Sequence, residues 1–130
     1  PPLLSKRLKS CSVFLQLIDP LAGKTVSPEQ VDMAAKIMKA SLNKMETVFL
    51  KDTPYLCSEK LSIADFFGVC ELMQPQMGLQ MNVTKDFPKV AAWSELVRQS
   101  IGTELFDEAH KFISSAGQKF SQMNIPTPKL

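Results

Sequence analysis

Apolar residues recur with a helical period along most of the chain. Between Leu3 and Ile18, and again from Ser27 to about residue 50, they return every three or four positions with polar residues between them. Residues 87–101 and 104–113 show the same spacing, which is typical of helices that bury one face. No stretch alternates with the period of two that marks β-strands. The pattern predicts an all-α fold, a helical bundle of about five helices.

The second of these helices has a clear start. Ser27 is a favourable cap, Pro28 fits the first helical position, and Gln30 stands where it returns a hydrogen bond to the cap. The segment around Pro54 ends the helix. The positions expected to face inward are Val31, Ala34, Ala35, Met38, Leu42, Met45 and Phe49.

A reciprocal cap is predicted before the third helix. Ser62 and Asp65 stand three residues apart, so the hydroxyl accepts from the N–H of Asp65 while the carboxylate accepts from the N–H of Ser62. Leu61 and Phe66 occupy the two positions of a hydrophobic staple across this cap. No histidine or lysine adjoins Ser62 to activate its hydroxyl. We therefore expect all four residues to have a structural role.

The stretch that follows this cap is apolar on nearly all sides. Residues 66–73 include only one charged side chain, so we expect a core helix that other helices enclose and that Pro75 stops or kinks. In the last helix Leu105, Phe106, Ala109, Phe112 and Ile113 are expected to lie together. The predicted domain covers residues 1–116, followed by a poorly ordered tail at residues 117–130.

Composition narrows the functional classes. With 130 residues, 45% hydrophobic and 22% charged, the chain is one ordinary globular domain. A net charge of +2 with mixed signs argues against nucleic-acid binding, despite the cluster of Lys6, Arg7 and Lys9. No run is long enough to span a membrane. The odd cysteine count, without metal-ligand spacing, indicates reduced thiols, no metal site and a cytoplasmic location.

The remaining candidates for chemistry are weak. His110 lies near Asp107, but no nucleophile adjoins it, so a surface histidine is the preferred interpretation. Met73, Met77 and Met81 suit either a pliable apolar pocket or ordinary packing, and packing is favoured. The residues thus predict no catalytic group within this chain.

Several stretches nevertheless resemble one family in its own order. The stretch LSIADFF from Leu61, followed by ELMQP ending at Pro75, resembles the central helix of glutathione transferase C-terminal domains, and its second part is most like the theta class. Three further stretches are similar to the neighbouring helices: Val26 to Pro28, Phe87 to Trp93, and LFDEAHKFI from Leu105. The resemblance covers about residues 26–113.

This resemblance implies that two domains have different roles in the reaction. In the family, a thioredoxin-like N-terminal domain binds the co-substrate glutathione, and theta members use a serine there to stabilise its thiolate. The helical domain supplies part of the pocket for a small apolar electrophile. The chain starts inside an expected helix without an initiator Met, so we expect a fragment that lacks the first domain, is inactive alone and contains no cofactor.

The same resemblance implies the expected partners and two candidate substrate-binding residues. Arg7 and Cys11 lie where family members have the helix that faces the cleft, which makes them candidate substrate-binding residues. The expected partners are the missing thioredoxin-like domain or another protein, and family members commonly form homodimers. The alternative is a non-catalytic interaction module, because similar helical domains occur in elongation-factor gamma subunits and aminoacyl-tRNA synthetases.

Overall fold

The computed structural model describes residues 23, 25 and 27–123. These residues form helices and connections without any β-strand, which confirms the all-α prediction for this part of the chain. The helix expected at residues 3–18 lies outside the described residues. The α-helices are α2 (Pro28–Lys44), α3 (Ile63–Met73), α4 (Pro88–Ile101) and α5 (Thr103–Ser121); π-helical turns η2 (Met45–Phe49) and η3 (Gln74–Gly78) extend α2 and α3.

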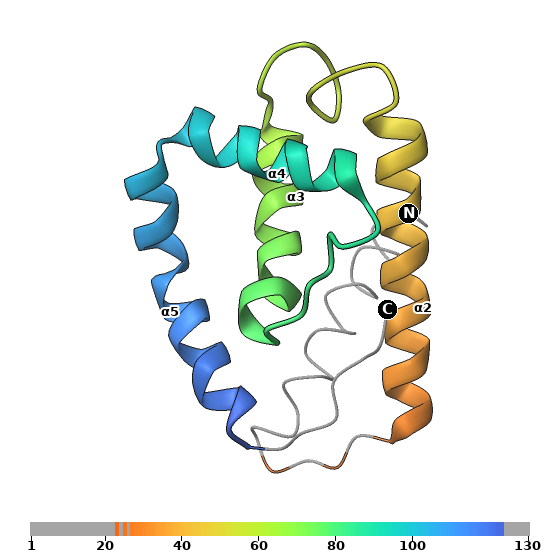
Figure 1. Ribbon diagram of the computed structural model, residues 1–130, viewed down its shortest axis with the longest axis vertical. Coiled ribbons are helices and arrows are strands. Elements are labelled where there is room, and N and C mark those ends of the chain that lie inside the picture. The colour runs from red at the N-terminus through yellow and green to blue at the C-terminus, as the bar shows by residue number, and fades with distance from the viewer. Residues whose placement is uncertain (1–22, 24, 26, 124–130) are drawn as a thin grey trace.

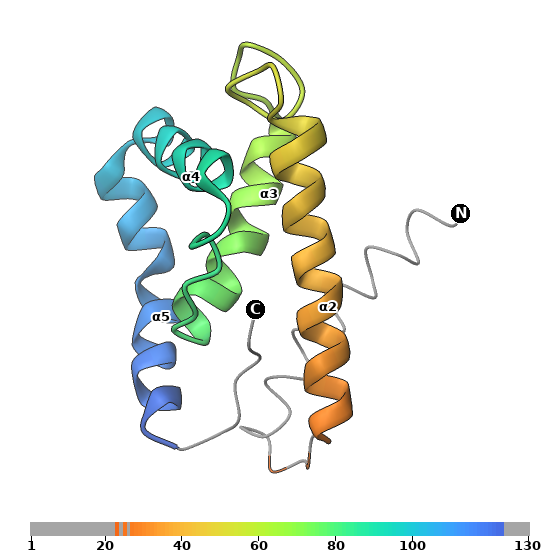
Figure 2. The same ribbon diagram turned by 45° about the vertical axis from the view of Figure 1, so that its right-hand side comes forward.

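Helix α3 runs through the middle of the described structure. It lies between α2 and α5, and α4 crosses it near its N-terminal end (Figures 1 and 2). The core forms where these helices meet, around the fully buried Trp93 of α4 and Val69 of α3. Val83, from the connection between η3 and α4, is equally buried. The connection therefore helps to close the core.

Helix α2 begins as its sequence predicts. The Ser27 hydroxyl accepts from the N–H of Gln30 at 3.3 Å, and Gln30 Oε1 accepts from the N–H of Ser27 at 3.0 Å. Four predicted inward positions are buried: Val31, Ala34, Ala35 and Leu42.

The prediction for Phe49 at the end of this helix was wrong. Its side chain is 46% exposed, whereas Leu50 is buried. The π turn η2 explains the change, because its wider turn shifts the register of the last residues. The N–H of Leu50 donates to the carbonyl of Met45, five residues back, at 2.9 Å. Leu50 therefore takes the inward position.

A side chain from η2 caps helix α4. The residue before α4, Phe87, has no side chain that can accept from the first helical N–H groups. The Glu46 carboxylate does so instead: Oε1 accepts from the N–H of Lys89 at 3.0 Å and Oε2 from that of Val90 at 2.9 Å. Its negative charge also suits the positive end of the helix dipole. Glu46 thus fixes α4 to the end of α2.

Removing this cap should weaken the fold measurably. We expect Glu46→Ala to lower the free energy of unfolding by about 1–2 kcal/mol, the usual effect of losing a helix cap. Urea denaturation followed by the fluorescence of Trp93 measures this change. Glu59→Ala, at an exposed loop position, is the control and should stay within about 0.5 kcal/mol of the parent. Equal effects of the two substitutions would contradict the capping role.

Helix α5 extends past the domain boundary expected at residue 116. It continues to Ser121, and both Gly117 and Phe120 are buried. These residues therefore belong to the packed domain. Residues 124–130 of the expected tail lie outside the described residues.

The apolar residues of α5 lie along one side of the helix, but the described structure buries only part of that side. Phe106 is buried, whereas Leu105 is 65% exposed and Phe112 is 84% exposed. Successive residues of a helix turn by about 100° around its axis, and Phe106, Gly117 and Phe120 set the side that packs against the domain. Leu105 and Phe112 lie on the neighbouring, uncovered side.

Candidate functional site

The most connected polar group of the described structure is the Asp65 carboxylate. Asp65 is fully buried at the start of α3. Its Oδ1 accepts from the N–H of Leu56 at 2.9 Å and from the indole Nε1 of Trp93 at 2.8 Å. Its Oδ2 accepts from the N–H of Ser62 at 2.8 Å and from the Ser62 hydroxyl at 3.0 Å. One carboxylate thus joins α3, α4 and the loop before α3.

These contacts set the protonation state of Asp65. Burial raises the pKa of the carboxyl, but hydrogen bonds from Leu56, Trp93 and Ser62 outweigh it and hold the pKa below its ordinary value. The carboxylate is therefore charged at neutral pH, and all four of its donors come from the protein. Such a group stabilises the fold and is poorly placed to remove a proton from a substrate.

The rest of the predicted cap is only partly buried. Leu61 packs against the hydrophobic core, whereas Phe66 is 43% exposed. The sequence placed Asp65 in a local cap, but its bond to Trp93 joins residues 28 positions apart. The only available signal for this bond was that the indole N–H of Trp93 needs an acceptor when it is buried, and that a buried carboxylate elsewhere in the chain can provide one.

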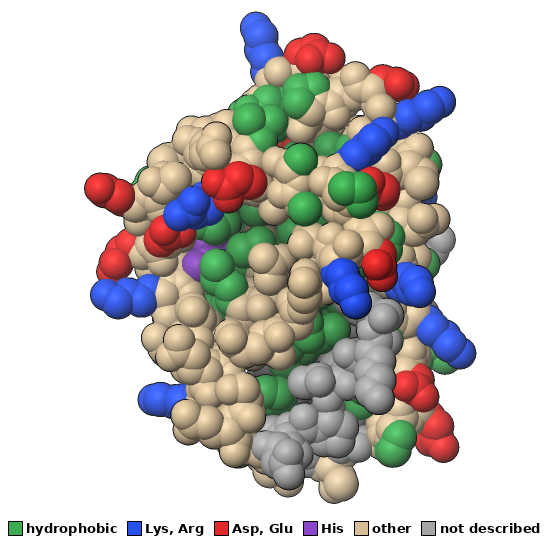
Figure 3. Space-filling model, viewed as in Figure 1, with side chains coloured by type: hydrophobic (Ala, Val, Ile, Leu, Met, Phe, Trp, Pro, Cys, Tyr) green, Lys and Arg blue, Asp and Glu red, His purple; other side chains and the backbone are tan. Residues whose placement is uncertain are grey.

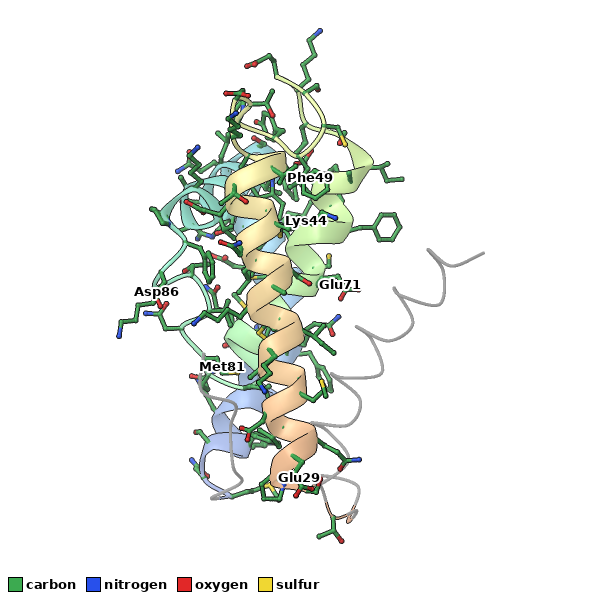
Figure 4. All side chains as sticks on the ribbon, turned by 90° about the vertical axis from the view of Figure 1, so that its right-hand side faces the viewer. Glu29, Lys44, Phe49, Glu71, Met81 and Asp86 are labelled. Atoms are coloured by element: carbon green, nitrogen blue, oxygen red, sulfur yellow. The ribbon has the colours of Figure 1, made fainter. Side chains whose placement is uncertain are left out.

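The described helices leave one side of α3 uncovered, so its enclosure by other helices stays a prediction. Ile63 is 72% exposed and Phe67 is 61% exposed, and Cys70 is also exposed. In Figure 4, α4 and the connection that carries Asp86 lie on one side of α2 and α3, and none of the described helices covers the opposite side. The apolar sequence of α3 indicated that its side chains are buried, but it did not indicate which helix or partner covers them.

His110 and Asp107 do not form a catalytic pair. His110 lies on the face shown in Figure 3, where its Nδ1 is 2.7 Å from the carbonyl oxygen of Phe106 and its ring packs on that phenyl ring. Asp107 instead accepts two hydrogen bonds from Arg98, at 2.9 and 2.7 Å. These bonds raise the pKa of Arg98 and lower that of Asp107. Both side chains join α4 to α5 at the surface.

A shallow hollow of about 260 Å³ lies beside these groups. Its lining is Met77, Asp107, His110, Lys111, Ser114 and Ser115. Met73 and Met81 are buried in the core, and Met77 is partly buried. The three methionines therefore do not line a shared apolar pocket, which agrees with the packing interpretation.

The candidate substrate-binding residues Arg7 and Cys11 lie outside the described residues. Cys57 and Cys70 are free cysteines with exposed side chains. Among the residues that the structure describes, no group of three or more His, Cys, Asp or Glu could hold a metal ion. None of the described helices is long and apolar enough to cross a membrane.

Comparison with known proteins identifies the domain. The family model for the glutathione S-transferase C-terminal domain matches residues 16–101. Human glutathione S-transferase theta-2 is 34% identical over 116 residues, which are 89% of this chain and 47% of the human protein. Bovine glutathione S-transferase theta-1 is 38% identical over 107 residues, 82% of this chain and 43% of that protein.

Solved structures agree with this assignment. A human theta-class glutathione transferase in complex with the glutathione conjugate of 1-menaphthyl sulfate superposes with a TM-score of 0.76 at 33% identity, covering 90% of this chain and 50% of that one. Human glutathione transferase theta-2 in complex with glutathione and an unknown ligand also gives 0.76 at 33% identity, covering 90% and 48%. This chain spans about half the length of these relatives. It belongs to the glutathione S-transferase family and matches the C-terminal helical domain of its theta class.

Proposed function

We propose that this chain is the substrate-side half of a theta-like glutathione transferase, which conjugates glutathione to small electrophiles when joined to a thioredoxin-like half. The observation that carries the proposal is the extent of the match: 89% of the chain aligns with only 47% of human theta-2. The portion of the relative that this chain does not span is the thioredoxin-like, glutathione-binding half implied by the family resemblance.

The polar groups of the described residues support this division. Conjugation requires a thiol that is held in place and whose pKa is lowered by nearby donors or positive charge. The Asp65 carboxylate already accepts four hydrogen bonds within the fold. Arg98 is paired with Asp107 and Glu95. Thiol activation is therefore assigned to the other half.

The relatives also suggest the kind of substrate. One structural neighbour is a complex with the glutathione conjugate of 1-menaphthyl sulfate. A small aromatic electrophile of this kind is the proposed substrate class here as well. We also propose that the joined protein is cytoplasmic and forms a homodimer.

The first test is the activity of the 130-residue chain itself. We expect conjugation of glutathione to 1-menaphthyl sulfate to proceed no faster with the chain than without it, because nothing in the described residues activates the thiol. Absorbance of the conjugate measures the rate. The control is human theta-2 assayed under the same conditions. Turnover by the isolated chain would contradict the proposed division between the halves.

A further inference from the structure

A hollow of about 460 Å³ lies between α2 and the connection that leads to α4. It is lined by Lys36, Lys39, Ala40 and Asn43 of α2, and by Asp86 and Phe87 just before α4. Phe87 is buried, whereas both lysines are exposed. The hollow therefore combines an apolar residue of the core with two ammonium groups at its rim.

These two lysines begin a row of exposed lysines that we call the lysine ridge. The ridge consists of Lys36, Lys39, Lys51 and Lys89, all of them exposed. Lys36 and Lys39 stand three residues apart and share one side of α2. Nζ of Lys89 donates to the carbonyl oxygen of Lys51 at 3.1 Å, which holds the start of α4 beside the end of η2. In Figure 3, lysine and arginine side chains, coloured blue, gather along the edge where α2 meets the connection to α4.

The ridge ammonium groups are accessible to a partner. Among the residues that the structure describes, the ion pairs are formed by Arg98 and Lys111, and none involves a ridge lysine. The Glu46 carboxylate lies beside the ridge, but its oxygens accept from the N–H groups of Lys89 and Val90. Exposed charges of one sign attract and orient a partner of the opposite sign. The ridge is therefore suited to a negatively charged partner.

The hollow and the uncovered side of α3 lie on opposite sides of the domain. In Figure 4, the connection that carries Asp86 lies on one side of α2 and α3, and none of the described helices covers the opposite side. Phe67 points away from α4, because it stands about 160° around the helix axis from Asp65, which accepts a hydrogen bond from Trp93 of α4. A partner that covers Phe67 therefore leaves the hollow accessible.

We propose that the lysine ridge and its hollow are a docking site for a short acidic segment of another protein. This inference goes beyond the proposed transferase function and does not depend on it. Carboxylates of the segment lie against Lys36 and Lys39, and an apolar side chain between them enters the hollow above Phe87. The volume of about 460 Å³ is within the range of pockets that bind small molecules, so the hollow accommodates such a side chain.

A nucleic acid fits the ridge less well than an acidic peptide. Bases of single strands stack on exposed aromatic side chains, but the aromatic residue of the hollow, Phe87, is buried. Asp32, Asp52 and Asp86 are exposed near the ridge and repel a continuous row of phosphates. A peptide avoids this repulsion because it places its carboxylates only opposite the lysines.

Binding of a labelled acidic peptide to the 130-residue chain tests this inference. The probe is a fluorescein-labelled peptide of glutamates with one central leucine, and the control peptide has a glutamine in place of each glutamate. We expect only the glutamate peptide to gain fluorescence anisotropy, with an affinity that falls as salt rises, because salt screens exposed charges. No gain, or equal gains for the two peptides, would overturn the inference. Tighter binding of a single-stranded RNA than of the glutamate peptide would overturn it too.

Charge reversal separates the ridge from the net charge of the chain. The double variant Lys36→Glu/Lys39→Glu should weaken binding of the glutamate peptide by about tenfold or more, because it replaces two attractions with two repulsions. Lys111→Glu/Lys119→Glu is the matched control, since it changes the net charge equally at exposed positions of α5. It should leave the affinity within about twofold of the parent, because distant exposed charges are screened. Equal weakening by the two variants would assign the binding to net charge and contradict the docking site.

Discussion

Asp65→Ala should lower the free energy of unfolding by about 4 kcal/mol, because it removes the acceptor of three N–H groups in or near the core. These groups are the N–H of Leu56, the N–H of Ser62 and the indole Nε1 of Trp93. Each unpaired buried donor costs about 1–3 kcal/mol. Urea denaturation followed by Trp93 fluorescence measures the loss.

Asp65→Asn is the informative companion because it keeps the size of the side chain. The amide retains one oxygen that accepts hydrogen bonds. Its NH₂ group replaces the second oxygen and faces the groups that donated to that oxygen. We expect a loss of about 2 kcal/mol, between the parent and the alanine variant. A loss below about 0.5 kcal/mol for Asp65→Ala would contradict the role assigned to this carboxylate.

The Asp65 contribution should also depend on pH in a defined direction. Its folded pKa lies below the ordinary value of 3.8, so the unfolded chain binds its proton first as pH falls. The stabilisation is therefore fully present above about pH 5 and is lost as pH falls through the folded pKa. The difference in unfolding free energy between the parent and Asp65→Asn should shrink from pH 7 to pH 3. A difference that stays constant would contradict this linkage.

Gly117→Ala should destabilise the chain by about 3 kcal/mol, because α5 approaches η3 at this glycine without room for a methyl group. A Cβ there would overlap the backbone carbonyl of Met77 and lie 2.9 Å from Gln80 Nε2. The backbone oxygen cannot rotate away, so the two helical segments must separate. Thermal and urea unfolding measure the effect.

Gly68→Ala is the matched control for this substitution. A Cβ at Gly68 would meet only side-chain atoms, Leu56 Cδ1 at 3.0 Å and Trp93 Cη2 at 3.1 Å. Side chains can shift by a few tenths of an ångström, and alanine favours helix by up to about 1 kcal/mol. We expect a change of about 1 kcal/mol or less at Gly68. Equal losses at both positions would contradict the close approach of α5 to η3.

The sequence predicted well those features that depend on residues close to one another in the chain. The cap at Ser27 involves residues three positions apart, so one short pattern contained both partners of each hydrogen bond. Glu46 and Val90 are 44 positions apart, and nothing at either position indicates that the other will be near. The same holds for Asp65 and Trp93.

The apolar sides of α3 and α5 show a second limit of prediction from the sequence. The composition of α3 indicated burial, yet Phe67 is exposed in the described structure. Phe112 of α5, which belongs to the apolar set expected to lie together, is exposed as well. An apolar side chain signals that something should cover it, whether that cover belongs to the same helical domain or to a partner. The sequence of one half alone does not separate these two cases.

The most direct test of the proposed function compares the isolated chain with a joined polypeptide, in which the glutathione-binding half of human theta-2 is fused to this chain. Both are assayed for conjugation of glutathione to 1-menaphthyl sulfate, with the serine of the glutathione-binding half replaced by alanine as the control. We predict turnover by the joined polypeptide, none above the uncatalysed rate by the isolated chain, and a large loss in the serine variant. A folded joined polypeptide without turnover would contradict the proposal and favour a non-catalytic interaction module.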